Sequence, residues 1–222
     1  MSYTVKSIDS PVRLDAEWSS PVWTAAETLT VGNFRPEGSD HRPLVQCRLL
    51  HDAVGIYGMF QVHDRYVRSV ATEFQSSVCR DSCVEFFVGP ACGKGYLNFE
   101  MNCGGTLLVY HHMIDHSCER GGLNDSRKLA PEDISGFRIF HTMPGVVEPE
   151  ITEPAIWRIG FFIPFEIFVK THGLKLPVSG QIWRANFYKC GDHTSHKHWA
   201  SWKPVKKLNF HRPEDFGKIV FA

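Results

Sequence analysis

Short runs of apolar residues, many of them alternating with polar ones, recur along the chain and are bounded by Gly, Pro or Asp. They are rich in β-branched and aromatic residues, which favour strands. We predict ten strands from them, at residues 43–52, 55–64, 82–90, 96–103, 106–113, 136–143, 155–165, 182–190, 198–204 and 217–222. The pattern therefore indicates an all-β protein.

Helical signals are few. The segment PFEIFVKTHG predicts about two helical turns starting from Pro164, and PEDISG near Pro131 predicts one short turn. The polar stretch at residues 115–135 is expected to be a loop. Without repeats or a Pro/Ser-rich hinge, residues 1–222 are predicted to form a single domain, a β-sandwich of two antiparallel sheets with about ten strands.

One of these predicted strands carries a glutamate in an apolar setting. In DSCVEFFVGP, Glu85 shares a face with Cys83 and Phe87, because successive side chains of a strand point to opposite faces. Burial of an unpaired carboxylate is costly. We therefore expect Glu85 either to meet a partner on a neighbouring strand or to line a cavity that a polar ligand enters.

Two other strands each present a polar face. The face in YLNFEMNC includes Glu100 and Asn102, and the face in IWRANFYKC includes Arg184 and Tyr188. If the Glu85 strand lies beside or between them, Arg184 becomes a partner for Glu85. Such a face is either a satisfied structural network or a site for saccharides, whose hydroxyls bind polar side chains and whose C–H faces stack on aromatic rings.

Five segments carry a family resemblance, over residues 8–221. In order they are DSCVEFFVGP, YLNFEMNCGGTLL, WRIGFFIPFEIF, IWRANFYKCGD and FHRPEDFGKIVF. The chain resembles family 9 carbohydrate-binding modules and the wider family 9-like group. The resemblance implies a β-sandwich and a non-catalytic domain that binds a sugar or glycan on a concave polar face.

The resemblance also implies roles for single residues. Members bind a terminal sugar between two tryptophans, with a glutamate and an arginine bonding its hydroxyls. The glutamate corresponds to Glu85, whereas the arginine position holds Glu100 and the tryptophan positions fall near Cys79 and on Phe210. The predicted ligand-binding residues are Glu85, Glu100, Asn102, Arg184, Tyr188 and Phe210.

Two further functions stay open at the level of sequence. Glu85 and Glu100 on neighbouring strands could supply the paired carboxylates of a glycoside hydrolase, although no catalytic motif accompanies them. Related sandwich domains hold haem b, and conceivable ligands here are Met59, Met101 or Met113 with His63 or His112.

Metal binding has weak signals. In GDHTSHKHW, His196 and His198 would share a face of an extended segment, with His193 nearby; His111, His112 and His116 form a weaker group. Modules of this family can hold structural calcium, for which Asp64 and Asp81 are turn carboxylates, although no D-x-D-x-D-G loop is present. We expect no cofactor other than a possible calcium ion.

Four tryptophans are interpreted as structural. Trp199 and Trp202 cannot both face one side of a regular strand, and we expect Trp202 to pack in the core. Trp18 and Trp23 are expected to cover an end of the sandwich, since large aromatic side chains dominate core packing.

Composition narrows the partners. Lys plus Arg and Asp plus Glu both number 24, so no basic surface for nucleic acid or an anionic membrane is indicated. Seven cysteines without a C-x-x-C pair favour reduced thiols. The sequence as written shows no signal peptide, which predicts a cytoplasmic protein, or a periplasmic or extracellular one if a signal peptide was removed. It does not indicate the oligomeric state.

Overall fold

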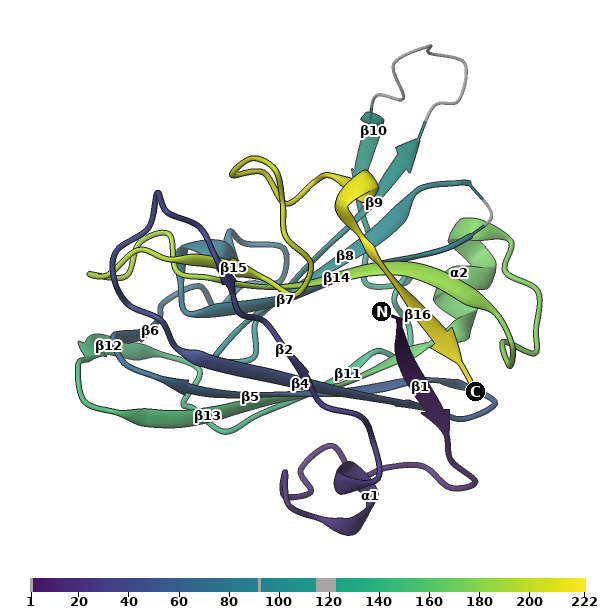
Figure 1. The fold of residues 1–222 in the computed structure, drawn as a ribbon, viewed down its shortest axis with the longest axis horizontal. Helices are drawn as coiled ribbons and strands as arrows, with labels where there is room; N and C mark the ends of the chain where they lie inside the picture. The colour runs from purple at the N-terminus through teal and green to yellow at the C-terminus, as the bar shows by residue number, and fades with distance from the viewer. Residues whose placement is uncertain (1, 92, 115–122) are drawn as a thin grey trace.

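The fold is known from a computed structural model, which describes residues 2–91, 93–114 and 123–222. Most of the chain forms one 14-stranded sheet that curls into two layers, and a 2-stranded sheet of β12 and β6 lies beside it. Figure 1 shows the two layers one above the other. The prediction of an all-β chain with few helices is confirmed.

The upper layer contains the polar strands singled out in the sequence. Its order is β10-β9-β8-β7-β14-β16, and β15 and β3 extend it beside β14. Its strands are β3 (Asn33–Phe34), β7 (Cys83–Pro90), β8 (Tyr96–Asn102), β9 (Leu107–Ile114), β10 (Leu123–Lys128), β14 (Ile182–Cys190), β15 (Trp199–Ser201) and β16 (Gly217–Phe221).

The lower layer has the order β4-β5-β13-β11, with β2 beside β4. Its strands are β2 (Leu29–Thr30), β4 (Leu44–His51), β5 (Gly55–Asp64), β11 (Arg138–His141) and β13 (Ala155–Pro164). The small sheet pairs β6 (Val67–Ser69) with β12 (Val147–Ile151). All ten predicted strands are present, and the further ones are mostly short.

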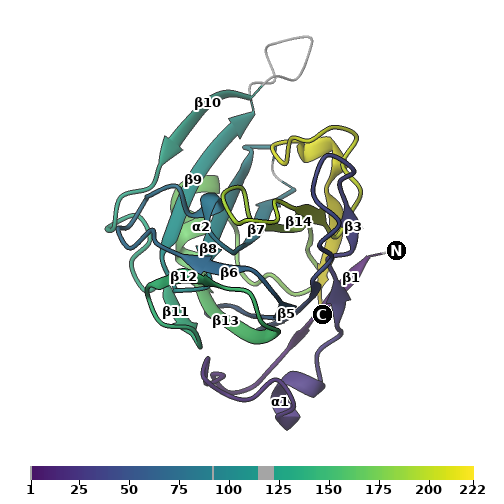
Figure 2. The same cartoon turned by 90° about the vertical axis from the view of Figure 1, so that its left-hand side faces the viewer.

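Strand β1 (Tyr3–Ser7) joins the layers, which differs from the predicted pair of separate antiparallel sheets. Its first half pairs in parallel with β16 and its second half pairs in parallel with β4. The sheet therefore continues around one edge of the sandwich, where both chain ends lie (Figure 2). The apolar faces of both layers meet in one large core that contains Phe86, Phe99, Trp157 and Phe187.

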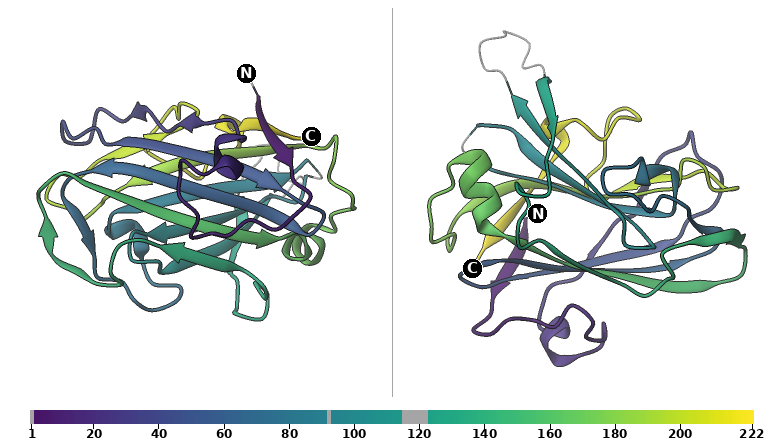
Figure 3. Two further views of the ribbon diagram at one scale, coloured as in Figure 1. Left: turned by 90° about the horizontal axis from the view of Figure 1, so that it is seen from below. Right: turned by 180° about the vertical axis from the view of Figure 1, so that it is seen from behind.

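Helix α2 (Phe165–His172) confirms the helix predicted after Pro164. It ends at Gly173, which adopts a left-handed conformation with φ 66°. Figure 3 shows α2 at one end of the sandwich. No helix forms near Pro131, where the chain makes turns. Among the described residues, the remaining helical segments are α1 (Pro21–Thr24) and the single 3-10 turns η1 (Val78–Arg80) and η2 (Pro213–Asp215).

Two other expectations need correction. Part of the predicted loop at residues 115–135 is β10, which pairs with β9, while residues 115–122 lie outside the described residues. Trp23 and Trp18 cover the outer face of the lower layer rather than an end, because they pack with Tyr57, Met59 and neighbouring side chains of a second hydrophobic cluster. No helix in the described ranges has the length and apolarity to cross a membrane.

Candidate functional site

Glu85 lies in the middle of the outer face of the upper layer. Strand β7 runs between β8 and β14, so Glu85 is directly opposite Glu100 on one side and Tyr188 on the other. The residues that alternate with Glu85, such as Val84 and Phe86, point into the core. The predicted sharing of one face by these strands is therefore seen in the structure.

A cavity of about 360 Å³ opens above this face, under the segment at residues 208–211. This volume lies within the range of about 300–1,000 Å³ that is usual for ligand pockets. The lining residues are Cys79, Glu85, Glu100, Cys190, Asp192, Trp199, Leu208, Asn209, Phe210 and His211. Three of the six predicted binding residues thus line one pocket: Glu85, Glu100 and Phe210.

The two glutamates form a buried carboxylate pair in this pocket. Glu85 is 3% exposed and Glu100 is 7% exposed. Burial and the facing Glu100 raise the pKa of Glu85 well above its usual range, and burial raises the pKa of Glu100 to about 7. Like charges in a dry site favour a shared proton, so the pair holds at least one proton near neutral pH when no cation neutralises it.

Each carboxylate has one oxygen engaged by the protein. The Cys190 thiol donates to Oε1 of Glu85 over 2.9 Å, and Nδ2 of Asn98 donates to Oε1 of Glu100 over 2.6 Å. No hydrogen bond from another described residue reaches Oε2 of either glutamate. Two acceptors on the pocket floor are therefore available to a ligand that brings hydrogen-bond donors.

Tyr188 supports the pocket wall and does not face the ligand space. Its hydroxyl donates to the carbonyl of Phe210 over 3.0 Å, and the two rings stack with centroids 4.0 Å apart. These contacts hold the segment at residues 208–211 over the sheet. Tyr188 is thus a positioning residue for Phe210, which offers the aromatic surface.

The pocket is also lined by residues that were not predicted from the sequence to belong to the site. Trp199 is half-buried and donates through Nε1 to Oδ1 of Asp192 over 2.7 Å. Trp202 instead packs against the core and contacts Phe187 edge-on, as predicted. Because two tryptophans three residues apart on a strand face opposite sides, the WASW segment already indicated that one of them leaves the core.

The expected partnership of Arg184 with Glu85 is wrong. Arg184 lies opposite Gly89, four residues along β14 from Tyr188, and lines a separate cavity with Tyr96 and other residues. It forms no ion pair with the residues that the structure describes. The side chain is on the predicted face, but the register of β14 against β7 carries it beyond reach.

Asn102 also lies outside the pocket lining. Its amide donates to Oδ2 of Asp81 and to the carbonyl of Ala71, each over 2.9 Å, and its oxygen accepts from the backbone of Thr106. Asp81 accepts further backbone hydrogen bonds and contacts Arg68. Asn102 and Asp81 therefore fix the loop beside η1 and have their polar groups satisfied within the protein.

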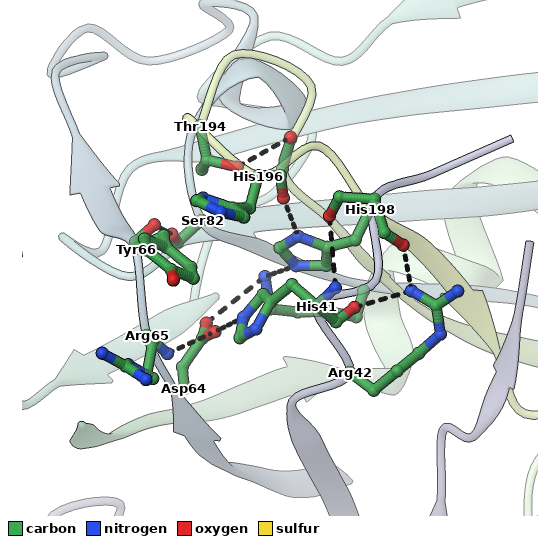
Figure 4. Close-up of polar contacts among 12 residues, drawn as sticks. His41, Arg42, Asp64, Arg65, Tyr66, Ser82, Thr194, His196 and His198 are labelled. Carbon is green, nitrogen blue, oxygen red and sulfur yellow. Dashed lines mark hydrogen bonds and ion pairs between the residues drawn. The ribbon is translucent and has the colours of Figure 1, made fainter. Parts of the chain in front are cut away.

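A second polar cluster lies near the same end of β14 but on its core-facing side. Figure 4 shows His41, Asp64 and His198 directed toward one another. The ammonium of Lys189, which is fully buried, lies 2.8 Å from Nε2 of His198 and 3.5 Å from Oδ2 of Asp64. Burial would raise the pKa of Asp64, but Lys189 and the His41 hydrogen bond outweigh burial and lower it.

This cluster does not fit calcium. Calcium takes six to eight oxygen ligands, whereas the grouped donors are two imidazoles and the single carboxylate of Asp64. The Lys189 ammonium already supplies a positive charge among them, and Asp64 also accepts from Nε1 of Trp157 over 3.1 Å. Asp64, predicted as a calcium ligand, therefore belongs to a buried ion pair.

The predicted histidine groups are not assembled as expected. His198 is buried beside Lys189, His196 stacks on Tyr66 with ring centroids 3.6 Å apart (Figure 4), and His193 is exposed. The segment is irregular there, so His196 and His198 do not share a strand face. His111 contacts His172 and His112 contacts His211 as rings, and His116 lies outside the described residues.

The conceivable haem ligands do not converge. Met101 is buried in the main core, Met59 is buried in the cluster outside the lower layer, and His63 is exposed on β5. Met113 and His112 lie on β9 in the upper layer. Met101 faces the core, whereas His112 contacts the His211 ring on the outer face of the upper layer. Met113 and His112 are neighbours on β9 and therefore point to opposite faces of the strand.

Two thiols, those of Cys79 and Cys190, also line the pocket. The five described cysteines, Cys47, Cys79, Cys83, Cys103 and Cys190, are free thiols. Donor atoms of Cys83, Glu85 and Cys190 lie within 4.8 Å of one another. Burial raises the pKa of Cys83 to about 12, so this thiol stays protonated at neutral pH. Cys92 and Cys118 lie outside the described residues.

Comparison with known proteins places this geometry in a family. A solved structure from Bacteroides uniformis, described as a "putative carbohydrate-binding protein", is similar over 100% of this chain and 99% of that chain, with 26% identity and a TM-score of 0.83. A family 9 module from Caldicellulosiruptor kristjanssonii in complex with glucose is similar over 100% of this chain and 96% of its own, with 13% identity and a TM-score of 0.66.

A structure of a family 9 module from the same organism in complex with cellotriose covers 99% of this chain and 93% of its own, at 16% identity and a TM-score of 0.65. At these identities the two modules show the fold. No curated protein sequence matches the chain. The model of carbohydrate-binding family 9 matches residues 23–221, which confirms the resemblance seen in the sequence. The chain therefore belongs to carbohydrate-binding family 9.

Proposed function

We propose that this protein is a non-catalytic carbohydrate-binding domain and that the pocket above Glu85 and Glu100 is its binding site. The observation that carries the proposal is a buried carboxylate, Glu85, which lines a ligand-sized cavity and whose Oε2 accepts no hydrogen bond from another described residue. Membership in carbohydrate-binding family 9 and the sugar complexes of two similar modules support carbohydrate as the ligand.

The walls of the pocket suit a sugar ring. The half-buried Phe210 is held against the sheet by Tyr188, and Trp199 lines the same cavity. Aromatic rings cover the apolar C–H faces of saccharides, while the floor carboxylates accept from hydroxyl groups. The ligand would therefore be held by polar bonds from the floor and by apolar contact from the side.

The geometry favours binding over glycoside hydrolysis. A glycosidase places its two carboxyl groups on opposite sides of the scissile bond. Glu85 and Glu100 instead extend from adjacent strands on one pocket floor, directly opposite each other in the sheet. Neither the matching family nor the three similar structures above are described as hydrolases.

The test combines a glycan panel, containing neutral, acidic and basic sugars, with the variant Glu85→Gln. A hydrogen bond that Glu85 accepts from the glycan is worth about 0.5 to 1.5 kcal/mol if Glu85 is protonated and about 1.5 to 3 kcal/mol if Glu85 carries the charge of the pair. We therefore expect Glu85→Gln to weaken binding of a recognised glycan by about 2- to 150-fold with little loss of folding stability. Titration calorimetry and a thermal melt measure both quantities. A large fall in melting temperature with unchanged affinity would make Glu85 a scaffold residue, and binding to no member of the panel would contradict the proposal.

A further inference from the structure

The floor of the pocket carries two carboxyl groups, and no lysine or arginine is among the described residues that line it. Glu85 and Glu100 face each other across β7 and β8, and no hydrogen bond from another described residue reaches their Oε2 atoms. Directly opposed like charges destabilise a sheet, and burial increases this cost. A protein that keeps such a pair in a cavity gains most from a ligand that brings positive charge.

The lining supplies no positive charge of its own. Among the described lining residues there is no lysine or arginine, and a third carboxylate, Asp192, is present on the wall. Burial lowers the pKa of His211, which keeps this imidazole neutral. The nearest buried ammonium, that of Lys189, lies on the core-facing side of β14 and is paired with Asp64.

The aromatic wall restricts the shape of this cationic ligand. Phe210 is fixed by the Tyr188 hydroxyl and ring, so it offers a rigid face beside the carboxylates. An aromatic face accepts both the C–H groups of a sugar ring and an adjacent ammonium group. An amine attached directly to a pyranose ring would meet the carboxylates while the ring lies against Phe210.

From these contacts we infer that the pocket selects amino sugars whose nitrogen is a protonated primary amine, in preference to neutral and N-acetylated sugars. This inference rests on the proposed function, because it names the class of carbohydrate that the same site takes. A primary ammonium group has three N–H donors, and its charge favours ionisation of Glu85 and Glu100, whose Oε2 atoms then accept from it as carboxylates. An acetamido group has one N–H donor and no charge, so it leaves the pair uncompensated.

Calcium suits the pocket less well. Calcium requires six to eight oxygen ligands, and the wall carboxylate Asp192 is already bound by Trp199. The thiol of Cys190 takes part in the floor as a donor to Glu85, which leaves few oxygen ligands. A ligand with hydroxyl groups and one ammonium group fits this pocket better, because its lining combines carboxyl groups, a thiol and an aromatic ring.

The test uses three β-1,4-linked trisaccharides that differ at carbon 2: cellotriose with hydroxyl groups, the chitin trimer with acetamido groups, and the chitosan trimer with free amines. Titration calorimetry of the full chain is done without metal ions at about pH 6.5, below the usual pKa of an α-amino group. We expect the chitosan trimer to bind at least about tenfold more tightly than the other two, which equals about 1.4 kcal/mol.

Two variants locate the selectivity. Glu100→Gln should reduce the preference for the amine to less than about threefold, because one charge–charge contact is lost. Glu153→Gln, which changes an exposed carboxylate elsewhere, should leave the preference unchanged. Undiminished binding of the chitosan trimer by Glu100→Gln would overturn the inference, since the attraction would then arise outside the pocket.

The outcomes separate this inference from the proposed function. If cellotriose or the chitin trimer binds as tightly as the chitosan trimer and Glu85→Gln weakens that binding, the pocket binds sugar but the amine selectivity is refuted. If neutral sugar binds only after calcium is added, the missing cation is inorganic and the inference is again refuted. If no trimer and no member of the wider glycan panel binds, the proposed function fails together with the inference.

Discussion

Replacing Glu100 with glutamine removes one of the two carboxylates that face each other across β7 and β8. Glutamine has nearly the same shape, keeps an oxygen that can accept from Asn98, and gains an amide that can donate to Glu85. The variant therefore relieves repulsion between buried acids without creating a cavity. We expect Glu100→Gln to stabilise the fold at neutral and higher pH while it alters ligand binding.

The pKa of Glu100 fixes the size and the pH window of this effect. Burial raises this pKa from 4.5 to about 7, which means that the folded protein disfavours the charged form. The folded state thus binds more protons than the unfolded chain between about pH 4.5 and 7, and wild-type stability from this group falls as pH rises through that window. One pKa unit corresponds to about 1.4 kcal/mol, so the gain in the variant approaches about 3 kcal/mol above pH 7.

Urea denaturation of wild type and variant from about pH 4 to 8 measures the difference directly. We expect nearly equal stability at about pH 4 and a difference that grows toward pH 8, with a rise in melting temperature of up to roughly 10 °C. Buried histidines such as His112 and His198 have lowered pKa values, which make stability rise with pH. This contribution is the same in both proteins and cancels in the difference between them. Glu153→Gln serves as the exposed control. If the difference in stability did not depend on pH, or if Glu100→Gln destabilised the protein at pH 8, the reasoning that Glu85 and Glu100 repel each other as buried acids would be refuted.

Three further predictions follow from single contacts. Lys189→Met removes the ammonium partner of the buried Asp64 carboxylate and should lower the free energy of unfolding by about 3 to 5 kcal/mol in urea denaturation, and adding Asp64→Asn should restore part of the loss. Equal stability of the single and double variants would contradict this pairing. Tyr188→Phe removes the hydrogen bond to the Phe210 carbonyl, so it should lower the free energy of unfolding by about 1 kcal/mol and weaken glycan binding severalfold. Unchanged affinity in calorimetry would show that Tyr188 has no role in positioning Phe210 for binding. Among the five described thiols, half-buried Cys79 should be alkylated first in the native protein, which peptide mass spectrometry measures. A bound glycan should slow this alkylation because Cys79 lines the pocket.

Local patterns were sufficient to predict ten of the strands and the faces on which their side chains lie, although β10 was expected to be part of a loop. The alternation in DSCVEFFVGP places Glu85 on the face of the strand that points away from the core, whereas Val84 and Phe86 point into it. This two-residue period can be recognised without knowing the rest of the chain. The helix after Pro164 was equally readable, since Gly173 and the flanking proline bound it. Family resemblance added the sandwich and pointed to Glu85 and Phe210.

Only the tertiary structure decided which polar residues meet, because strand register and loop paths depend on long-range packing. The register places Arg184 opposite Gly89 and Tyr188 opposite Glu85, so the basic residue expected at the site lies away from it. Trp199 reaches the pocket because β15 pairs beside β14, which no local pattern specifies. Most importantly, two glutamates that were paired with Arg184 from the sequence are brought together in a pocket whose described lining residues include no lysine or arginine, and their raised pKa values distinguish the pocket chemically.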